Sequence, residues 1–219
     1  MKPDFSVELQ YKTKSDLIFG IDEVGRGSLA GPLTLCCLCL KKEFINNTSP
    51  ILKLGIKDSK KLTPKKRFDL IQKTKKYLAE KIILHNSNKR IDKLGISLCY
   101  KKSLTKLIKL LTKKYPKKKI VLLTDFFNIE HNRENITIVP IKSGDNLSAT
   151  IALSAIYAKV TRDKIMEIIH TKLPMYDWIN NKGYGTAKHI TAIKKYGVSK
   201  LHRQSFLNKV LSTRSKHTS

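Results

Sequence analysis

Five short apolar runs constrain the fold of this chain most, because each has the length of a buried strand and is bounded by turn-forming or polar residues. The runs cover residues 17–21, 33–40, 81–84, 120–124 and 136–139. Glycine and proline in residues 25–32 predict a turn between the first two runs. Segments with helical periodicity separate the later ones. This order of elements predicts an α/β domain with a mixed sheet flanked by helices.

One helical segment has a recognisable start. Thr63 and Pro64 suit the N-cap and first position of a helix that would run to about residue 78. Phe68, Ile71 and Leu78 would face inward along it. Further helices are expected over residues 91–111, from Asp145 or Ser148 to residue 169, over 186–196 and over 206–211.

The charge of the chain is unusual. Its 44 Lys and Arg residues against 17 Asp and Glu residues give a net charge of +27. Such a surface repels itself unless something anionic covers it, so a nucleic acid or an acidic membrane is the expected partner. A drift in base composition would also enrich lysine, isoleucine and asparagine, and charge alone does not choose between the two explanations.

Cysteine usage and hydropathy address the cellular compartment. Cys36, Cys37 and Cys39 lie in one apolar run and Cys99 stands alone, a pattern that fits neither a disulfide framework nor a zinc site. They are interpreted as core residues of a cytoplasmic protein. The longest apolar stretch, residues 29–40, falls short of the ~20 residues that cross a bilayer. No membrane span is therefore expected, and no signal peptide, because residues 1–16 are polar and charged. The expected partner is a nucleic acid and not a membrane.

Carboxylates end two of the predicted strands. Asp22 and Glu23 follow the first run and Asp125 follows the fourth, which would place them at one edge of a sheet, where α/β proteins have their sites. Hard cations such as Mg²⁺ prefer such oxygen ligands. For Asp22 and Glu23 the alternative is an exposed acidic turn. Asp145 and Asp163 would lie ~27 Å apart on one continuous helix, so at most one can join the cluster.

Of these two aspartates, Asp145 is the better candidate, although it could equally be a helix N-cap. Asp163, between Arg162 and Lys164, is interpreted as part of a structural ion pair.

Two glycine-rich segments suggest close approach of a ligand. Gly25 and Gly27 flank Arg26, which exposes backbone amides beside a guanidinium and suits a sugar-phosphate strand. Tyr184 is flanked by glycines and is a possible stacking platform for a nucleotide. The alternative for Tyr184 is a ring packed in the core.

Five motifs, in order, closely resemble those of the ribonuclease HII family. They are GIDEVGRG at 20–27 with AGP at 30–32, DSKKL at 58–62, SAIYAKVTRD at 154–163, KGYGT at 182–186 with His189, and HRQSF at 202–206. Any one motif would be weak evidence, but the ordered set spans almost the whole chain. The resemblance implies a ribonuclease H-like α/β fold with a helical C-terminal extension. We expect a catalytic domain over residues 1–172, the extension over 173–211 and a disordered tail over 212–219.

The resemblance also implies an activity. The enzyme would hydrolyse the RNA strand of RNA–DNA hybrids and nick duplex DNA 5′ of an embedded ribonucleotide, leaving 3′-hydroxyl and 5′-phosphate ends. Its catalytic carboxylates would be Asp22, Glu23, Asp125 and Asp145. They would hold divalent Mn²⁺ or Mg²⁺ in a two-metal mechanism, with Asp22 bridging the ions. A monomer is expected.

Substrate contacts are implied in the same way. The motif of Gly25, Arg26 and Gly27 would sense the 2′-hydroxyl at an RNA–DNA junction, and Tyr184 would stack there. Phosphate contacts would come from lysines in the matched motifs and beside them, namely Lys60, Lys61, Lys182 and Lys188. His189 and His202 are interpreted as structural or substrate-orienting residues.

Some positions depart from the family pattern. Ser28 stands where proline is common, and Phe126 follows Asp125 where glycine is common. Residues 94–100 also diverge. These departures concern loop geometry and leave the carboxylates in place.

Two other classes of function remain open. A non-catalytic RNA-binding protein would explain the charge but not the carboxylates, and would bind without metal. A different two-metal nuclease, such as a junction resolvase, would explain charge and carboxylates but not the two glycine-rich motifs.

Overall fold

The computed structural model describes residues 2–212, so the expected tail lies, apart from Ser212, outside the described residues. Backbone contacts divide the described chain into two compact units. The sheet unit comprises residues 2–24, 34–84 and 100–160, and the helical unit comprises residues 25–33, 85–99 and 161–212. The expected boundary at residue 172, between a catalytic domain and its extension, stays a prediction. Within residues 2–212, no helix is long and apolar enough to cross a bilayer.

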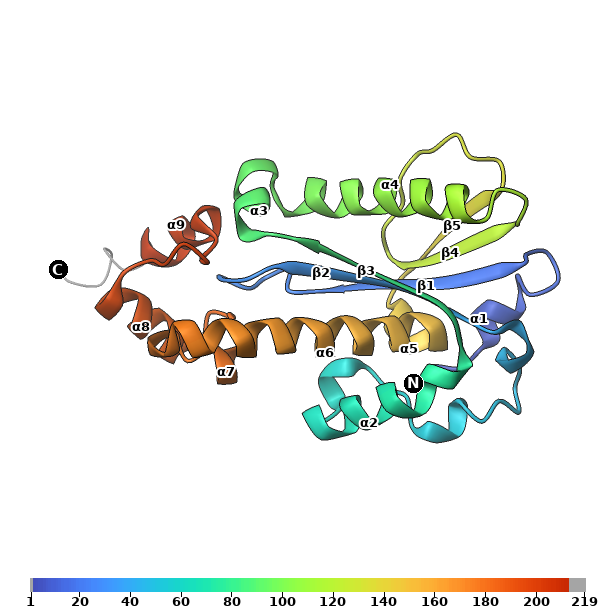
Figure 1. Cartoon of the computed structure of the whole chain (residues 1–219), viewed down its shortest axis with the longest axis horizontal. Coiled ribbons are helices and arrows are strands. Elements are labelled where there is room, and N and C mark those ends of the chain that lie inside the picture. The colour runs from blue at the N-terminus through green and yellow to red at the C-terminus, as the bar shows by residue number, and fades with distance from the viewer. Residues whose placement is uncertain (1, 213–219) are drawn as a thin grey trace. The chain divides into compact units, whose positions relative to one another are not determined.

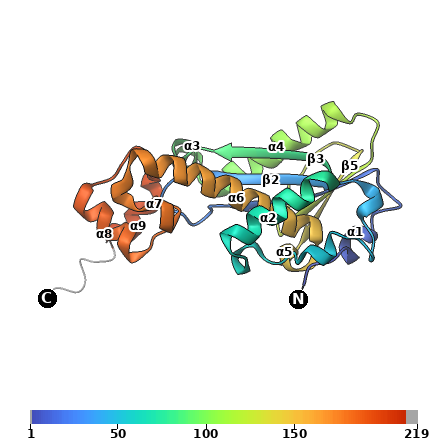
Figure 2. The same cartoon turned by 60° about the horizontal axis from the view of Figure 1, so that its bottom comes forward.

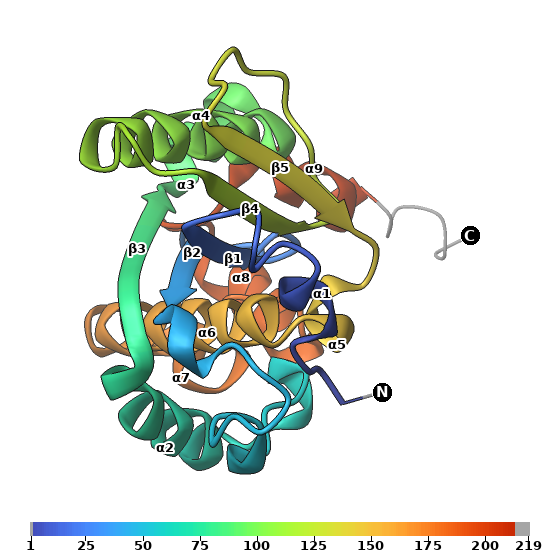
Figure 3. The same ribbon diagram turned by 90° about the vertical axis from the view of Figure 1, so that its right-hand side faces the viewer.

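A five-stranded mixed sheet forms the centre of the sheet unit (Figure 3). Its strands are β1 (Leu17–Val24), β2 (Leu33–Leu40), β3 (Leu78–Asn86), β4 (Ile120–Asp125) and β5 (Ile136–Ile141). They lie in the order β3-β2-β1-β4-β5. β1 is antiparallel to β2 and parallel to β4, which is parallel to β5. The predicted mixed sheet is confirmed.

Helices cover both faces of this sheet (Figure 1). α4 (Ile96–Lys114) covers one face, and α2 (Pro64–Thr74), α5 (Gly144–Leu147) and α6 (Ala149–Lys172) lie on the other. Every residue of β2 is buried, as expected for a central strand with both faces covered. The four cysteines are buried and unpaired in disulfides, which confirms their interpretation as core residues.

The remaining elements are short. The sheet unit also contains α1 (Ser6–Leu9) and the 3₁₀ turns Lys42–Phe44, Leu52–Leu54, Ser59–Lys61 and Lys75–Tyr77. The helical unit contains α3 (Asn88–Leu94), the 3₁₀ turn Pro174–Tyr176, α7 (Trp178–Asn181), α8 (Ala187–Tyr196) and α9 (Gln204–Ser212). Figure 2 shows α7, α8 and α9 following α6 along the chain.

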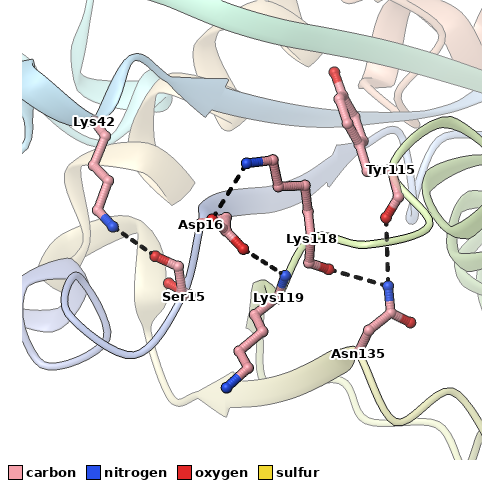
Figure 4. Close-up of polar contacts among 7 residues, drawn as sticks. All are labelled: Ser15, Asp16, Lys42, Tyr115, Lys118, Lys119 and Asn135. Atoms are coloured by element: carbon pink, nitrogen blue, oxygen red, sulfur yellow. Dashed lines mark hydrogen bonds and ion pairs between the residues drawn. The ribbon is translucent and has the colours of Figure 1, made fainter.

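Polar contacts fix the starts of β1 and β4 (Figure 4). The Asp16 amide donates to the Lys119 carbonyl at 2.8 Å, and the Lys119 amide donates to Asp16 Oδ2 at 2.8 Å. Asn135 Nδ2 donates to the Lys118 carbonyl at 3.1 Å. These bonds lock the register in which Ile21 lies beside Thr124 at the other end of the strands.

The helix predictions were less accurate than the strand predictions. α2 has the predicted N-cap, with Thr63 Oγ1 accepting from the Lys66 amide, but it ends at Thr74. Phe68 is 54 % exposed rather than inward, and Leu78 is the first residue of β3. The predicted helix over 91–111 is two helices broken at Gly95.

Candidate active site

Three carboxylates lie at one edge of the sheet unit, as the strand ends predicted. Asp22 and Glu23 are among the last residues of β1, and Asp125 is the last residue of β4. β1 and β4 are parallel, and Ile21 pairs with Thr124. The next residues along the two strands, Asp22 and Asp125, therefore lie at the same level of the sheet. The Glu23 amide donates to Asp22 Oδ1 at 2.7 Å.

Asp145 reaches this edge from a separate short helix. It lies in α5, and α6 begins only after Ser148, which has extended backbone angles. The assumption of one continuous helix from Asp145 to Asp163 was therefore wrong. Ser148, the other predicted cap, accepts from the Ile151 amide at 3.1 Å and so begins α6. The Gly144 amide donates to Asp125 Oδ1 at 2.8 Å, which fixes α5 against β4.

The four carboxylates affect one another electrostatically. Burial raises the pKa of Asp22 well above its usual value, and the negative charges of Glu23, Asp125 and Asp145 raise it further. Burial also raises the pKa of Asp145, with Asp125 the largest charge contribution. This mutual repulsion is relieved by a proton or a cation.

The loop before α2 adds a lysine to this edge. The charges of Asp58 and Lys60 both act on the pKa of Asp145, in opposite directions. Asp58 Oδ1 accepts from the Lys60 amide at 2.9 Å, and the buried Arg67 donates to the carbonyls of Ser59 and Leu62 at 2.9 and 2.6 Å. Lys60 is thus held beside the carboxylates. Asp58 was not predicted as a site residue.

The donor set suits a hard divalent cation, because it consists of carboxylate oxygens whose charges repel one another. Within residues 2–212, no group of three or more His, Cys, Asp or Glu side chains is arranged to hold a metal ion. The fit to a metal rests on the chemistry of the carboxylate oxygens.

The glycine-rich motifs lie in the helical unit. Gly25 has a φ of +99°, and a Cβ there would lie 2.3 Å from Arg162 Nε, so only glycine fits. Gly27 is exposed, and a Cβ at this position would have no atom within 4 Å. The Gly183 carbonyl accepts from the Leu29 amide at 2.7 Å, which connects this loop to the segment carrying Tyr184.

Tyr184 is half-buried, and the Arg162 guanidinium lies 5.4 Å from its ring centroid. Its carbonyl contacts His189 Nδ1 at 2.9 Å, and His189 Nε2 lies 3.1 Å from His202 Nε2. Both histidines are buried beside Trp178. Their positions favour the structural interpretation over direct contact with substrate.

Comparison with known proteins shows the family of this chain. The sequence profile of ribonuclease HII matches residues 19–209. Ribonuclease HII of Prochlorococcus marinus subsp. pastoris is 40% identical over 196 residues, which cover 89% of this chain and 90% of that protein. The chain belongs to the ribonuclease HII family. It is a ribonuclease H hydrolase.

Solved structures of lower identity share the fold. The chain of RNase HII in its complex with PCNA from Archaeoglobus fulgidus has a TM-score of 0.70 at 21% identity, covering 92% of this chain and 98% of that one. Bst-RNase HIII in complex with Mn²⁺ has a TM-score of 0.66 at 19% identity, covering 93% of this chain and 71% of that one. Both likenesses show the ribonuclease HII fold of this chain.

Two arginines next to the glycine-rich loop were missed as functional candidates. Arg162 and Arg203 are completely buried. Burial lowers the pKa of both, and Arg162 lowers that of Arg203 further, to about 9. A signal existed in the sequence: only seven of the 44 basic residues are arginine, and arginine is needed where a planar, multidentate donor must be buried.

Proposed function

We propose that this chain hydrolyses the RNA strand of RNA–DNA hybrids and nicks duplex DNA 5′ of single embedded ribonucleotides, leaving 3′-hydroxyl and 5′-phosphate ends. The observation that carries this proposal is the set of four carboxylates at one edge of the sheet unit, where burial and the charges of the other three raise the pKa of Asp22. Membership of the ribonuclease HII family supports the same chemistry.

In this proposal Asp22, Glu23, Asp125 and Asp145 hold divalent metal, Mn²⁺ or Mg²⁺. Divalent ions held there would supply an activated water and stabilise the leaving oxygen of a phosphodiester. The carboxylates would orient the ions, and Asp22 would be the central ligand, since the other three charges act on it. The Mn²⁺ complex of Bst-RNase HIII is consistent with this choice of metal.

Substrate contacts are proposed in each unit separately. Lys60, held near Asp145, contacts a phosphate without reading sequence. Gly25, Arg26 and Gly27 contact the 2′-hydroxyl at the junction, and the half-buried Tyr184 stacks there. Lys182, another expected phosphate contact, forms an ion pair with Glu167 at 2.9 Å, so its charge is already partly compensated.

The proposed partner is a nucleic acid duplex, the proposed state is a monomer and the proposed location is the cytoplasm. The net charge of +27 supports the choice of partner.

A single gel tests the proposed function. A DNA duplex with one embedded ribonucleotide is incubated with the protein in Mn²⁺, in Mg²⁺ and in EDTA, beside an all-DNA duplex of the same sequence. We expect one nick 5′ of the ribonucleotide, only with metal and only in the ribonucleotide duplex. Cleavage of the all-DNA duplex would favour a different nuclease, and binding without cleavage would favour a non-catalytic protein.

A further inference from the structure

The buried guanidinium of Arg203 holds the loop of Gly25, Arg26 and Gly27 by its backbone carbonyls. Arg203 Nη1 donates to the carbonyls of Gly25 and Arg26 at 2.6 and 3.0 Å, and Arg203 Nε donates to the Gly31 carbonyl at 3.0 Å. All of these residues lie in the helical unit.

Arg162 holds the residues that follow this loop and the segment that carries Tyr184. Its Nε donates to the Pro32 carbonyl at 2.9 Å and its Nη2 to the Ala30 carbonyl at 3.1 Å. Its Nη1 donates to the Lys182 carbonyl at 2.8 Å, and its guanidinium covers the Tyr184 ring. One side chain thus connects the two glycine-rich motifs.

Ser28 completes this network with its hydroxyl. Ser28 Oγ donates to the Gly25 carbonyl at 3.0 Å and accepts from Arg162 Nη2 at 2.8 Å. The side chain is completely buried. Proline, the residue that the family resemblance leads us to expect here, could make neither bond.

The direction of these bonds determines what the loop presents. Because the carbonyls of Gly25 and Arg26 accept from the buried Arg203 guanidinium, the orientation of the peptide groups in the loop is fixed. Backbone amides with fixed positive charge beside them favour an electron-rich oxygen of a ligand.

We propose that Arg162, Arg203 and Ser28 are positioning residues that fix this loop for selecting ribose over deoxyribose. The inference rests on the proposed function, since it concerns how a ribonucleotide junction is recognised. None of the three side chains contacts the substrate in this proposal. They act by fixing the backbone of Gly25–Gly27 and, through Arg162, the ring of Tyr184.

The test compares the binding of two duplexes in EDTA, which separates recognition from cleavage. One duplex contains a single ribonucleotide and the other is all DNA. Ser28→Ala removes both hydrogen bonds of the hydroxyl with little change of shape. Arg203→Lys keeps the positive charge but loses the planar guanidinium that donates to several carbonyls at once. The matched control is Ser15→Ala in the sheet unit, which also removes a buried hydroxyl bond to a carbonyl, at 2.8 Å from Tyr11 O.

We expect Ser28→Ala to lower the ratio of the two affinities roughly three- to tenfold, the factor that one net hydrogen bond contributes. Arg203→Lys should lower the ratio at least as much, and Ser15→Ala should leave it unchanged. General destabilisation would weaken binding of both duplexes equally and would leave the ratio unchanged.

The inference fails if Ser28→Ala, a substitution mild enough to preserve folding, keeps the ratio of the wild type. The inference is also overturned if wild-type protein binds both duplexes equally, because the loop would then not select ribose over deoxyribose. The proposed function fails separately, if wild-type protein with metal does not nick the ribonucleotide duplex.

Discussion

Glu8 and Asp22 are both carboxylates whose pKa is raised by burial, and their neighbours give them different roles. Burial raises the pKa of Glu8, but its Oε1 accepts from Ser148 Oγ at 2.6 Å and from the Thr150 amide at 2.8 Å. Glu8 therefore fastens α1 to the start of α6. Asp22 instead has three other carboxylates acting on it, which favours binding of a cation over a purely structural role.

At this scale, the sequence predicted residues whose position follows from a strand end, such as Asp22 and Asp125. It did not predict Arg162 and Arg203 as a pair. Their hydrogen bonds to residues 25–32 join segments more than 100 residues apart, and no local pattern encodes such a contact.

Tyr184→Ala is expected to damage nicking at a single ribonucleotide far more than cleavage of a long RNA–DNA hybrid. A lone ribonucleotide offers one register, so the loss of a stacking contact of ~1–3 kcal/mol is felt fully, whereas a hybrid offers many registers. Parallel time courses on the two substrates measure the ratio. Equal losses would mean that Tyr184 is a packing residue.

Among the elements, strands were easier to predict than helix ends. An apolar run bounded by turns is sufficient to predict β2, because both of its faces are covered. The breaks at Gly95 and Ser148 were missed, since hydrophobic periodicity continues across them. On α2, Ile71 is buried as predicted, whereas Phe68, three residues before it, is exposed.

The packing of α6 on β1 depends on Gly20. A Cβ at this position would lie 2.3–2.5 Å from backbone atoms of Thr150 and Ile151, and Ser154 Oγ donates to the Gly20 carbonyl at 2.8 Å. Gly20→Ala should therefore destabilise the fold by ~1–3 kcal/mol or more, measured by thermal unfolding. Gly27→Ala, where the added Cβ would have no atom within 4 Å, is the control and should unfold near the wild-type midpoint.

The packing between α8 and the segment before α9 should depend on pH through His202. Burial and the neighbouring His189 lower the pKa of His202 from 6.5 to about 4. As pH falls from 6.5 towards 4, the unfolded chain binds a proton that the folded chain does not, so stability is lost over this window.

The measurement for this prediction is the thermal midpoint of wild type and His202→Gln across that range. The wild type should lose more stability than the variant as pH falls, while carboxylates titrate in both. His131→Gln, at a less buried histidine, is the control and should follow the wild type. Parallel curves for wild type and His202→Gln would contradict the assignment.

For the whole molecule, the net charge of +27 should act through phosphate contacts. The logarithm of affinity for a plain DNA duplex should fall linearly with the logarithm of salt concentration, with a slope near −0.9 per phosphate neutralised. A flat response would instead support compositional drift as the origin of the lysines.

In the proposed function, cleavage depends on metal held at the carboxylate edge, and Asp22→Asn tests this dependence most directly. The amide removes one of the repelling charges, so the variant should unfold at a higher temperature than wild type in EDTA. The control is Asp16→Asn, at the opposite end of β1, which removes a negative charge outside the carboxylate edge and should not raise the unfolding temperature.

The decisive measurement is nicking of the single-ribonucleotide duplex by Asp22→Asn in Mn²⁺, together with binding of the same duplex. We expect nicking to be abolished while binding is retained or tightened, because a negative charge facing phosphate is lost. Nicking at a rate near that of the wild type would contradict the assignment of metal to this edge.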